Sequence, residues 1–101
     1  MDKKTPHYKL DDVKEMVRQL GVAAFTKTAL DGGRAMGLTS SEIIETVLSV
    51  SHKQFYKSMT THQDHRVWQD VYHVPTSIGP VAYVKFTCIN DIVVIQFKEK
   101  Q

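Results

Sequence analysis

The chain has 101 residues, 42% of them hydrophobic and 24% charged, which predicts a single domain over residues 1–101 and excludes a disordered polymer. It has no long apolar run, no signal-like N-terminus and one cysteine, so we expect no membrane insertion, no secretion and a cytoplasmic location. The net charge of +2 lies entirely in residues 51–101, which fits a phosphate-bearing partner but equally an ordinary solvated surface.

The first half of the sequence predicts three helices. Apolar residues at helical spacing, with Asp11 and Asp12 in front, predict a helix over residues 11–20. Thr39 and Glu42 have the spacing of a capping box and precede an apolar run, which predicts a helix over residues 40–50.

A further helix is expected between these two, after the candidate caps Thr26 and Thr28. Its weak point is the pair Gly32-Gly33, which would cost about 2 kcal/mol relative to two alanines in a helix interior.

After Ser51 the sequence changes to short β-branched and aromatic runs separated by polar or Pro/Gly clusters. These runs predict four strands, over residues 54–61, 66–74, 81–89 and 92–99. Helices followed by an antiparallel meander make an α+β fold.

The last hairpin has a predictable register. If Asn90-Asp91 is a two-residue turn, residue 89 faces residue 92, and Tyr83 then faces Lys98 while Lys85 faces Gln96. These four side chains share one face, and Val84, Phe86, Cys88, Val93, Ile95 and Phe97 face the core on the other. The polar face could bind a phosphodiester, or it could be an ordinary solvated sheet face.

Aromatic residues alternate with cations in Phe55-Tyr56-Lys57 and around Arg66, Trp68 and Tyr72, a combination that suits single-stranded RNA. Large aromatic side chains are mostly buried in small domains, so Phe55, Trp68 and Tyr72 are expected in the core rather than as base platforms.

No metal or cofactor site is predicted. His62, Asp64 and His65 match no zinc spacing, and no second cluster completes a set of four ligands. Cys88 is expected to be a buried structural thiol rather than a nucleophile.

Several long motifs in collinear order resemble the MqsR family of bacterial toxins. They are Lys4-Thr5-Pro6-His7, Phe55-Tyr56-Lys57-Ser58-Met59-Thr60-Thr61, Asp64-His65, Trp68-Gln69-Asp70-Val71-Tyr72 and Phe97-Lys98-Glu99-Lys100. The resemblance implies a RelE-like α+β fold and an mRNA interferase, a metal-independent endoribonuclease that arrests growth, with a GCU-like cleavage preference. It also implies an MqsA-like zinc-binding antitoxin as partner, with DNA contacted only through that antitoxin.

By motif, the family's catalytic residues fall on Lys57, Gln69, Tyr83 and Lys98. If Lys57 also faces Gln69 across the first strand pair, all four share one sheet face, but the longer loop between those strands leaves their register open. Lys57 and Lys98 would stabilise the phosphate charge, Tyr83 would position or exchange a proton, and Gln69 would orient the RNA.

Further RNA contacts are expected from Lys85, Gln96, Arg66 and His73. The segment that begins at His73 is less basic than the family pattern, which implies either a lower affinity for RNA or replacement of a cation by protonated His73. Residues 21–37 also depart from the family pattern. Two other functions remain open: a non-catalytic module that binds RNA or only an antitoxin, and a DNA-binding regulator, for which no basic recognition helix is seen.

Overall fold

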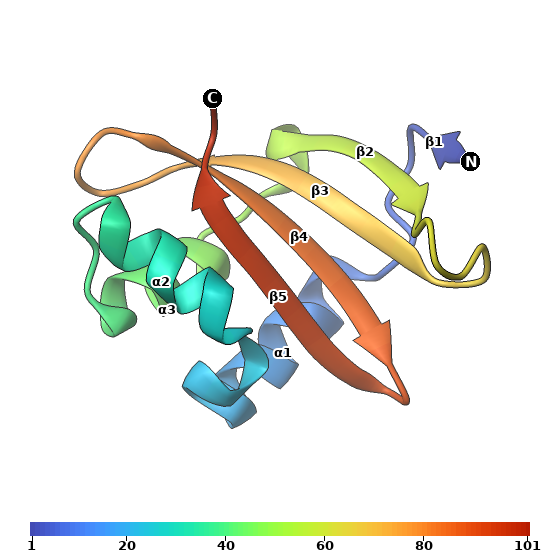
Figure 1. Cartoon of the computed structure of the whole chain (residues 1–101), viewed down its shortest axis with the longest axis horizontal. Helices are drawn as coiled ribbons and strands as arrows, with labels where there is room; N and C mark the ends of the chain where they lie inside the picture. Colours follow the sequence, from blue (N-terminus) through green and yellow to red (C-terminus); the bar gives the residue numbers. More distant parts are fainter.

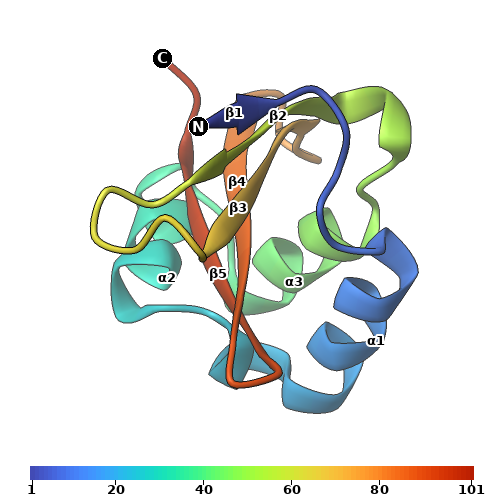
Figure 2. The ribbon, with the colours of Figure 1, turned by 90° about the vertical axis from the view of Figure 1, so that its right-hand side faces the viewer.

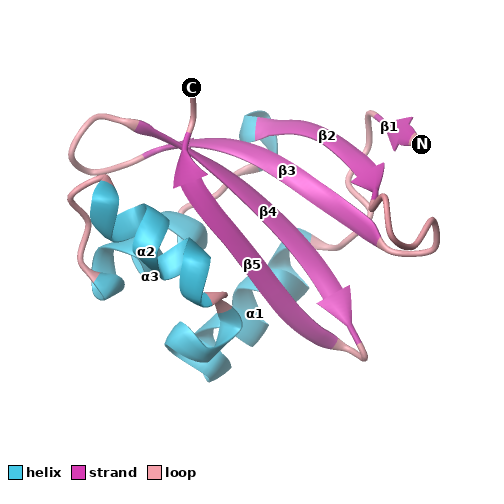
Figure 3. Ribbon diagram, in the orientation of Figure 1, coloured by secondary structure: helices cyan, strands magenta, loops and turns pink.

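The computed structural model describes residues 1–101, which form an antiparallel five-stranded sheet with helices packed against it (Figures 1 and 3). The strands lie side by side in the order of the sequence, so the sheet is a meander. The predicted α+β fold is confirmed. The elements are β1 (Asp2–Lys3), α1 (Leu10–Leu20), α2 (Lys27–Ala35), α3 (Ser40–Leu48), β2 (Phe55–Thr60), β3 (Trp68–Pro75), β4 (Val81–Ile89) and β5 (Ile92–Glu99), with short 3-10 helices η1 (Gly21–Ala24) and η2 (His52–Gln54).

The helix ends follow local chemistry. The capping box of α3 is present: the Glu42 N–H donates to the Thr39 hydroxyl at 3.2 Å, and the Thr39 N–H donates to the Glu42 carboxylate at 2.9 Å. The helix ends at Leu48, two residues before the predicted end. Helix α1 begins one residue earlier than predicted, at Leu10, and ends before Gly21, whose φ is +57°.

Helix α2 forms despite its two glycines. The neighbouring elements pack so closely against it that only glycine fits at these two positions. Thr26 is the N-cap and accepts the Ala29 N–H at 3.0 Å. A Cβ at Gly32 would collide with the backbone carbonyl of Phe97, and a Cβ at Gly33 would collide with the side chain of Ile43. The helix-weakening cost of the pair is therefore offset by close packing of α2 on β5 and α3.

The register of the last hairpin is confirmed in full. Asn90 and Asp91 both have positive φ, +53° and +63°, as a two-residue turn of type I′ requires. Tyr83 pairs with Lys98 and Lys85 with Gln96, as predicted.

The sheet has one strand more than predicted. Strand β1 is only two residues long and pairs with β2 through Asp2 opposite Met59 and Lys3 opposite Ser58. Two residues are too few to form a periodic pattern, so this strand could not be predicted from hydrophobic periodicity.

The core lies between the helices and one face of the sheet. Figure 2 shows α1 and α3 on the same side of the sheet, with α2 beside β5. Tyr72 is fully buried in this core, and Phe55 packs against it partly buried, as expected.

The prediction that Trp68 is a core residue is wrong. Its side chain is half-buried at the start of β3 and is covered by the N-terminal segment instead. The His7 ring stacks on it with 5.4 Å between ring centroids, and the Lys3 ammonium lies 4.1 Å from the centre of the indole ring.

A buried carboxylate anchors the same segment. Asp70 is fully buried on β3 and accepts hydrogen bonds from the backbone N–H groups of His7 and Tyr8, at 2.9 and 2.8 Å, and from the Ser58 hydroxyl at 2.6 Å. These donors satisfy a charge that would otherwise be costly to bury. The network joins the N-terminus, β2 and β3.

None of the helices is long and apolar enough to cross a membrane.

Candidate active site

The sheet face opposite α1 and α3, which we call the open face, carries the predicted site residues other than Arg66 in three cross-strand rows. This face points toward the viewer in Figure 1. One row runs His73, Tyr83, Lys98; the next runs Lys57, Val71, Lys85, Gln96; the third begins Met59, Gln69. Directly opposed residues point to the same side of a sheet, so all of these side chains share the open face.

Lys57 and Gln69 are not opposite each other. A register irregularity between Phe55 and Lys57 places Lys57 opposite Val71 and Gln69 opposite Met59. The offset is two residues, which keeps both side chains on the open face. The structure thus brings Lys57, Gln69, Tyr83 and Lys98 onto one surface, although by a different pairing from the one considered in the sequence.

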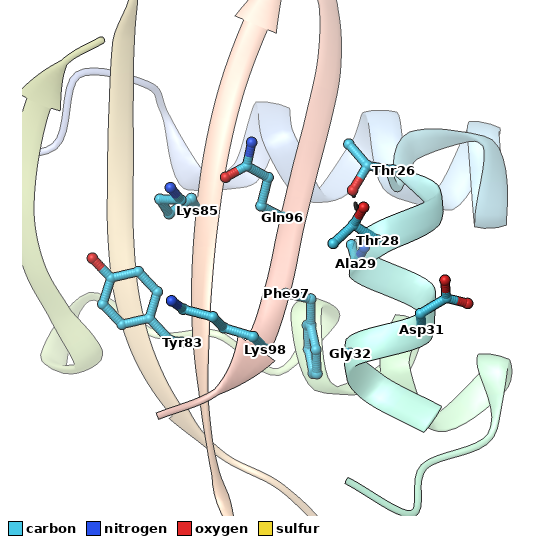
Figure 4. A pocket seen from close by; sticks show the side chains of 10 residues that line it. All are labelled: Thr26, Thr28, Ala29, Asp31, Gly32, Tyr83, Lys85, Gln96, Phe97 and Lys98. Carbon is cyan, nitrogen blue, oxygen red and sulfur yellow. Dashed lines mark hydrogen bonds between the residues drawn. The ribbon is translucent and has the colours of Figure 1, made fainter. Parts of the chain in front are cut away.

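Tyr83 and Lys98 form the most closely associated pair of the four. The Lys98 ammonium lies 5.5 Å from the centre of the Tyr83 ring. Both residues line a hollow of about 570 Å³ between β4, β5 and the first turns of α2, which we call the α2 hollow. Figure 4 shows the Lys98 side chain extended toward Tyr83, with Thr26 and Thr28 on the α2 side of the hollow, whereas the Asp31 carboxylate points away from the sheet.

Lys85 lies at the centre of the open face. It lines both the α2 hollow and a second hollow of about 400 Å³ that includes Gln69 and the loop after β2. Partial burial, followed by the nearby charge of Lys98, lowers the pKa of the Lys85 ammonium. Its neighbour Val71 is fully buried although it belongs to the open face, because its cross-strand neighbours Lys57 and Lys85 cover it with their long side chains.

Tyr56 also lies on this face, although the sequence named it only within the Phe55-Tyr56-Lys57 motif and not among the expected site residues. The bulge in β2 leaves it without a paired residue on β3, and its side chain is 52% exposed. Its ring stacks on that of His73 with centroids 4.4 Å apart, and the His73 ring lies 5.5 Å from that of Tyr83. The signal in the sequence was the spacing of Phe55 and Lys57, which would share one face of a regular strand although one is apolar and the other is charged.

The expectation that protonated His73 replaces a cation is not supported. Burial beside the two tyrosine rings, and then the charge of Lys100, lower the pKa of the imidazole. A lower pKa favours the neutral ring at neutral pH. The contact of His73 with RNA stays a prediction.

Arg66 is not brought to the hollows of the open face. It lies in the loop between β2 and β3, where its guanidinium contacts the Asp64 carboxylate at 3.1 Å. This pair raises the pKa of Arg66 and lowers that of Asp64. Its contact with RNA stays a prediction.

The remaining reactive groups do not form a further centre. No group of three or more His, Cys, Asp or Glu side chains is arranged to hold a metal ion. Cys88 is half-buried against the core, and burial together with the charges of Asp70 and Asp91 raises the pKa of its thiol. A raised pKa disfavours the thiolate, which is the nucleophilic form.

The open face can therefore bind and polarise a phosphodiester. Three lysines, Lys57, Lys85 and Lys98, share this face with a phenol and two amide side chains, on strands about 4.8 Å apart. Cations positioned this way stabilise the charge that develops on a phosphate during cleavage.

Comparison with known proteins gives the family. Residues 5–99 match the family model described as motility quorum-sensing regulator, toxin of MqsA. The chain is 41% identical over 100 residues to the mRNA interferase toxin MqsR of Escherichia coli K12, an alignment that covers 99% of this chain and 100% of the relative. With a family match over nearly its whole length and this degree of identity, the chain belongs to the MqsR toxin family.

Proposed function

We propose that this chain is the toxin of a toxin–antitoxin pair and an endoribonuclease that cleaves mRNA without a metal ion at GCU-like sites, thereby arresting growth. Family membership and the relative's name, mRNA interferase toxin, support the reaction class. The observation that carries the proposal is the convergence of Lys57, Gln69, Tyr83 and Lys98 on the open face of the sheet.

The reaction is an attack of the RNA 2′-hydroxyl on the adjacent phosphorus. The 2′-oxygen forms a bond to phosphorus, the bond from phosphorus to the 5′-oxygen breaks, and the products are a 2′,3′-cyclic phosphate and a 5′-hydroxyl. One group must accept the proton of the 2′-hydroxyl, and another must protonate the leaving 5′-oxygen. Cations must stabilise the negative charge that develops on the phosphate oxygens in the transition state.

We assign the stabilising charge to Lys57 and Lys98, which approach from β2 and β5. Tyr83 positions or exchanges a proton beside Lys98, and Gln69 orients the RNA from the next row of the face. Lys85 and Gln96 hold the RNA backbone between them. Its lowered pKa makes the Lys85 ammonium easier to deprotonate than that of an ordinary exposed lysine.

The partner is an MqsA-like antitoxin that binds zinc, and DNA is contacted only through that antitoxin. The family description, toxin of MqsA, supports the first part of this proposal. Because the proposed substrate is mRNA, we propose that the protein acts in the cytoplasm.

The deciding experiment incubates the purified protein with a purified mRNA in EDTA and maps the new 5′ ends. We expect cuts at GCU-like sequences that bear 5′-hydroxyl groups, and no cuts with Tyr83→Phe, which keeps the ring and removes only the hydroxyl. A folded wild-type protein that binds this RNA without cutting it would instead be a non-catalytic RNA-binding module. Cleavage that EDTA abolishes would exclude the metal-independent mechanism.

A further inference from the structure

The open face contains an aromatic strip that the cleavage mechanism uses only in part. The strip consists of Tyr56, His73 and Tyr83, from three adjacent strands. The rings of Tyr56 and His73 are nearly parallel, 25° apart, with centroids separated by 4.4 Å, and His73 is tilted by 39° to Tyr83 at 5.5 Å. Only Tyr83 has a role in the proton transfers described above.

Tyr56 is unusual among the aromatic residues of this chain in being exposed. The others are buried or half-buried, whereas 52% of Tyr56 is accessible to solvent. The bulge in β2 turns Tyr56 toward His73 instead of leaving it in the regular alternation. A bulge that presents an aromatic ring at the edge of a candidate active site is typical of a binding feature.

A hollow adjoins the strip and has the size and chemistry for a nucleobase. It has a volume of about 500 Å³, and all three rings line it together with Lys98 and Lys100. The rings supply flat surfaces for stacking, and the two lysines can hold the phosphates on either side of a base. Glu99 also lines this hollow and can accept a hydrogen bond from an exocyclic amino group.

We propose that Tyr56 and His73 form a stacking subsite for one unpaired nucleobase of the RNA, next to the phosphate held by Tyr83 and Lys98. This inference rests on the proposed function, because it names a further contact to the same substrate. Tyr56 provides the exposed ring. The His73 ring packs against it and also contacts the Tyr83 ring. The lowered pKa of His73 favours the neutral ring, which is consistent with stacking rather than with a phosphate contact.

The test separates binding from cleavage. The first probe is a short single-stranded RNA with 2′-fluoro sugars, which lacks the attacking hydroxyl. The second is a series of the same RNA in which each member lacks the base at one position. Dissociation constants are measured with the full-length protein and with Tyr56→Leu and Tyr56→Phe. Ile78→Ala serves as the matched control, because Ile78 is also large and exposed but lines none of the three hollows of the open face.

We expect Tyr56→Leu to weaken binding about tenfold, as loss of one base–aromatic stack does, and Tyr56→Phe and Ile78→Ala to bind within about twofold of the wild type. The loss should persist at high salt, unlike the contribution of a lysine–phosphate contact. At one position of the RNA, removal of the base should weaken binding to the wild type about tenfold but should hardly change binding to Tyr56→Leu. The removal of the base and the substitution of Tyr56 delete the same contact, so their effects should not add.

Equal losses in Tyr56→Leu and Tyr56→Phe would show that the hydroxyl rather than the ring acts, and would overturn the subsite. Unchanged binding in Tyr56→Leu would overturn it as well. Failure of the proposed function is seen separately: the wild type would then show the Tyr56-dependent binding but would not cut the corresponding RNA with 2′-hydroxyl groups.

Discussion

Tyr83 and Lys98 are direct partners across β4 and β5, and the Lys98 ammonium lies 5.5 Å from the centre of the Tyr83 ring. The phenol and the ammonium are thus held on one rigid hairpin whose turn defines their alignment. Two opposed side chains on adjacent strands can contact the same phosphate group without any movement of the backbone.

If this pair acts on one phosphate, the effects of removing its two members should not multiply. We expect Tyr83→Phe combined with Lys98→Ala to lose far less activity than the product of the two single losses. Cleavage rates of one short RNA by the wild type, both single variants and the double variant provide the measurement. Strictly multiplicative losses would contradict a shared phosphate.

Lys57→Ala should abolish cleavage and growth arrest while the protein remains folded. The lysine is half-buried on the open face and has no ion-pair partner, so its charge contributes little to stability, whereas the proposed mechanism uses that charge to stabilise the phosphate. Plating efficiency and the thermal midpoint would be compared with those of Lys53→Ala, a change of the same kind at an exposed lysine of η2. Full toxicity of a folded Lys57→Ala protein would remove Lys57 from the mechanism.

Asp70→Ala should destabilise the protein strongly, by more than about 3 kcal/mol, because it leaves the N–H groups of His7 and Tyr8 and the Ser58 hydroxyl without their acceptor. Urea unfolding would measure the loss in the free energy of unfolding. A change below about 1 kcal/mol would mean that water replaces the carboxylate at little cost.

Tyr72→Phe should leave the free energy of unfolding unchanged or raise it slightly. The Tyr72 hydroxyl is buried without a hydrogen-bond partner, and burial together with the charge of Asp70 raises the pKa of the phenol to about 12. Removing a buried, unpaired hydroxyl removes a desolvation cost and leaves the packing of the ring intact. The same urea experiment tests this, and a clear loss of stability would reveal a partner for the hydroxyl in solution.

His73 should make the protein less stable as the pH falls below neutrality. Its pKa is lower in the folded chain than the unfolded value of about 6.5, so between the two values the unfolded chain binds more protons and stability rises with pH. The stability is complete above the unfolded pKa and is lost as the pH decreases through about 6.5 toward the folded pKa. The groups that face the imidazole are the rings of Tyr56 and Tyr83 and the ammonium of Lys100.

Thermal midpoints measured from pH 7.5 down to pH 5.5 test this prediction. We expect His73→Gln to show a smaller decrease than the wild type, with His52→Gln, at an exposed histidine, as the matched control. Identical pH dependence in His73→Gln and wild type would contradict a lowered pKa at this position.

What could be predicted from the sequence was local. The Asn90-Asp91 turn alone determines which residues of β4 and β5 face each other, because a two-residue turn permits one register, and so it placed Tyr83 opposite Lys98 and Lys85 opposite Gln96. The Thr39–Glu42 capping box likewise depends only on residues three apart. The residue types of the candidate site came from the motif resemblance.

Only the tertiary structure decided the features that depend on distant segments. The loop between β2 and β3 permits several registers, and the observed one, with its bulge at Tyr56, depends on packing of the whole sheet. Gly32 and Gly33 also depend on distant segments, because they allow close packing against Phe97 and Ile43. Trp68 is covered by an N-terminal segment that is held by hydrogen bonds to Asp70. These contacts join residues far apart in the chain, and their energies depend on three-dimensional fit, which no local pattern encodes.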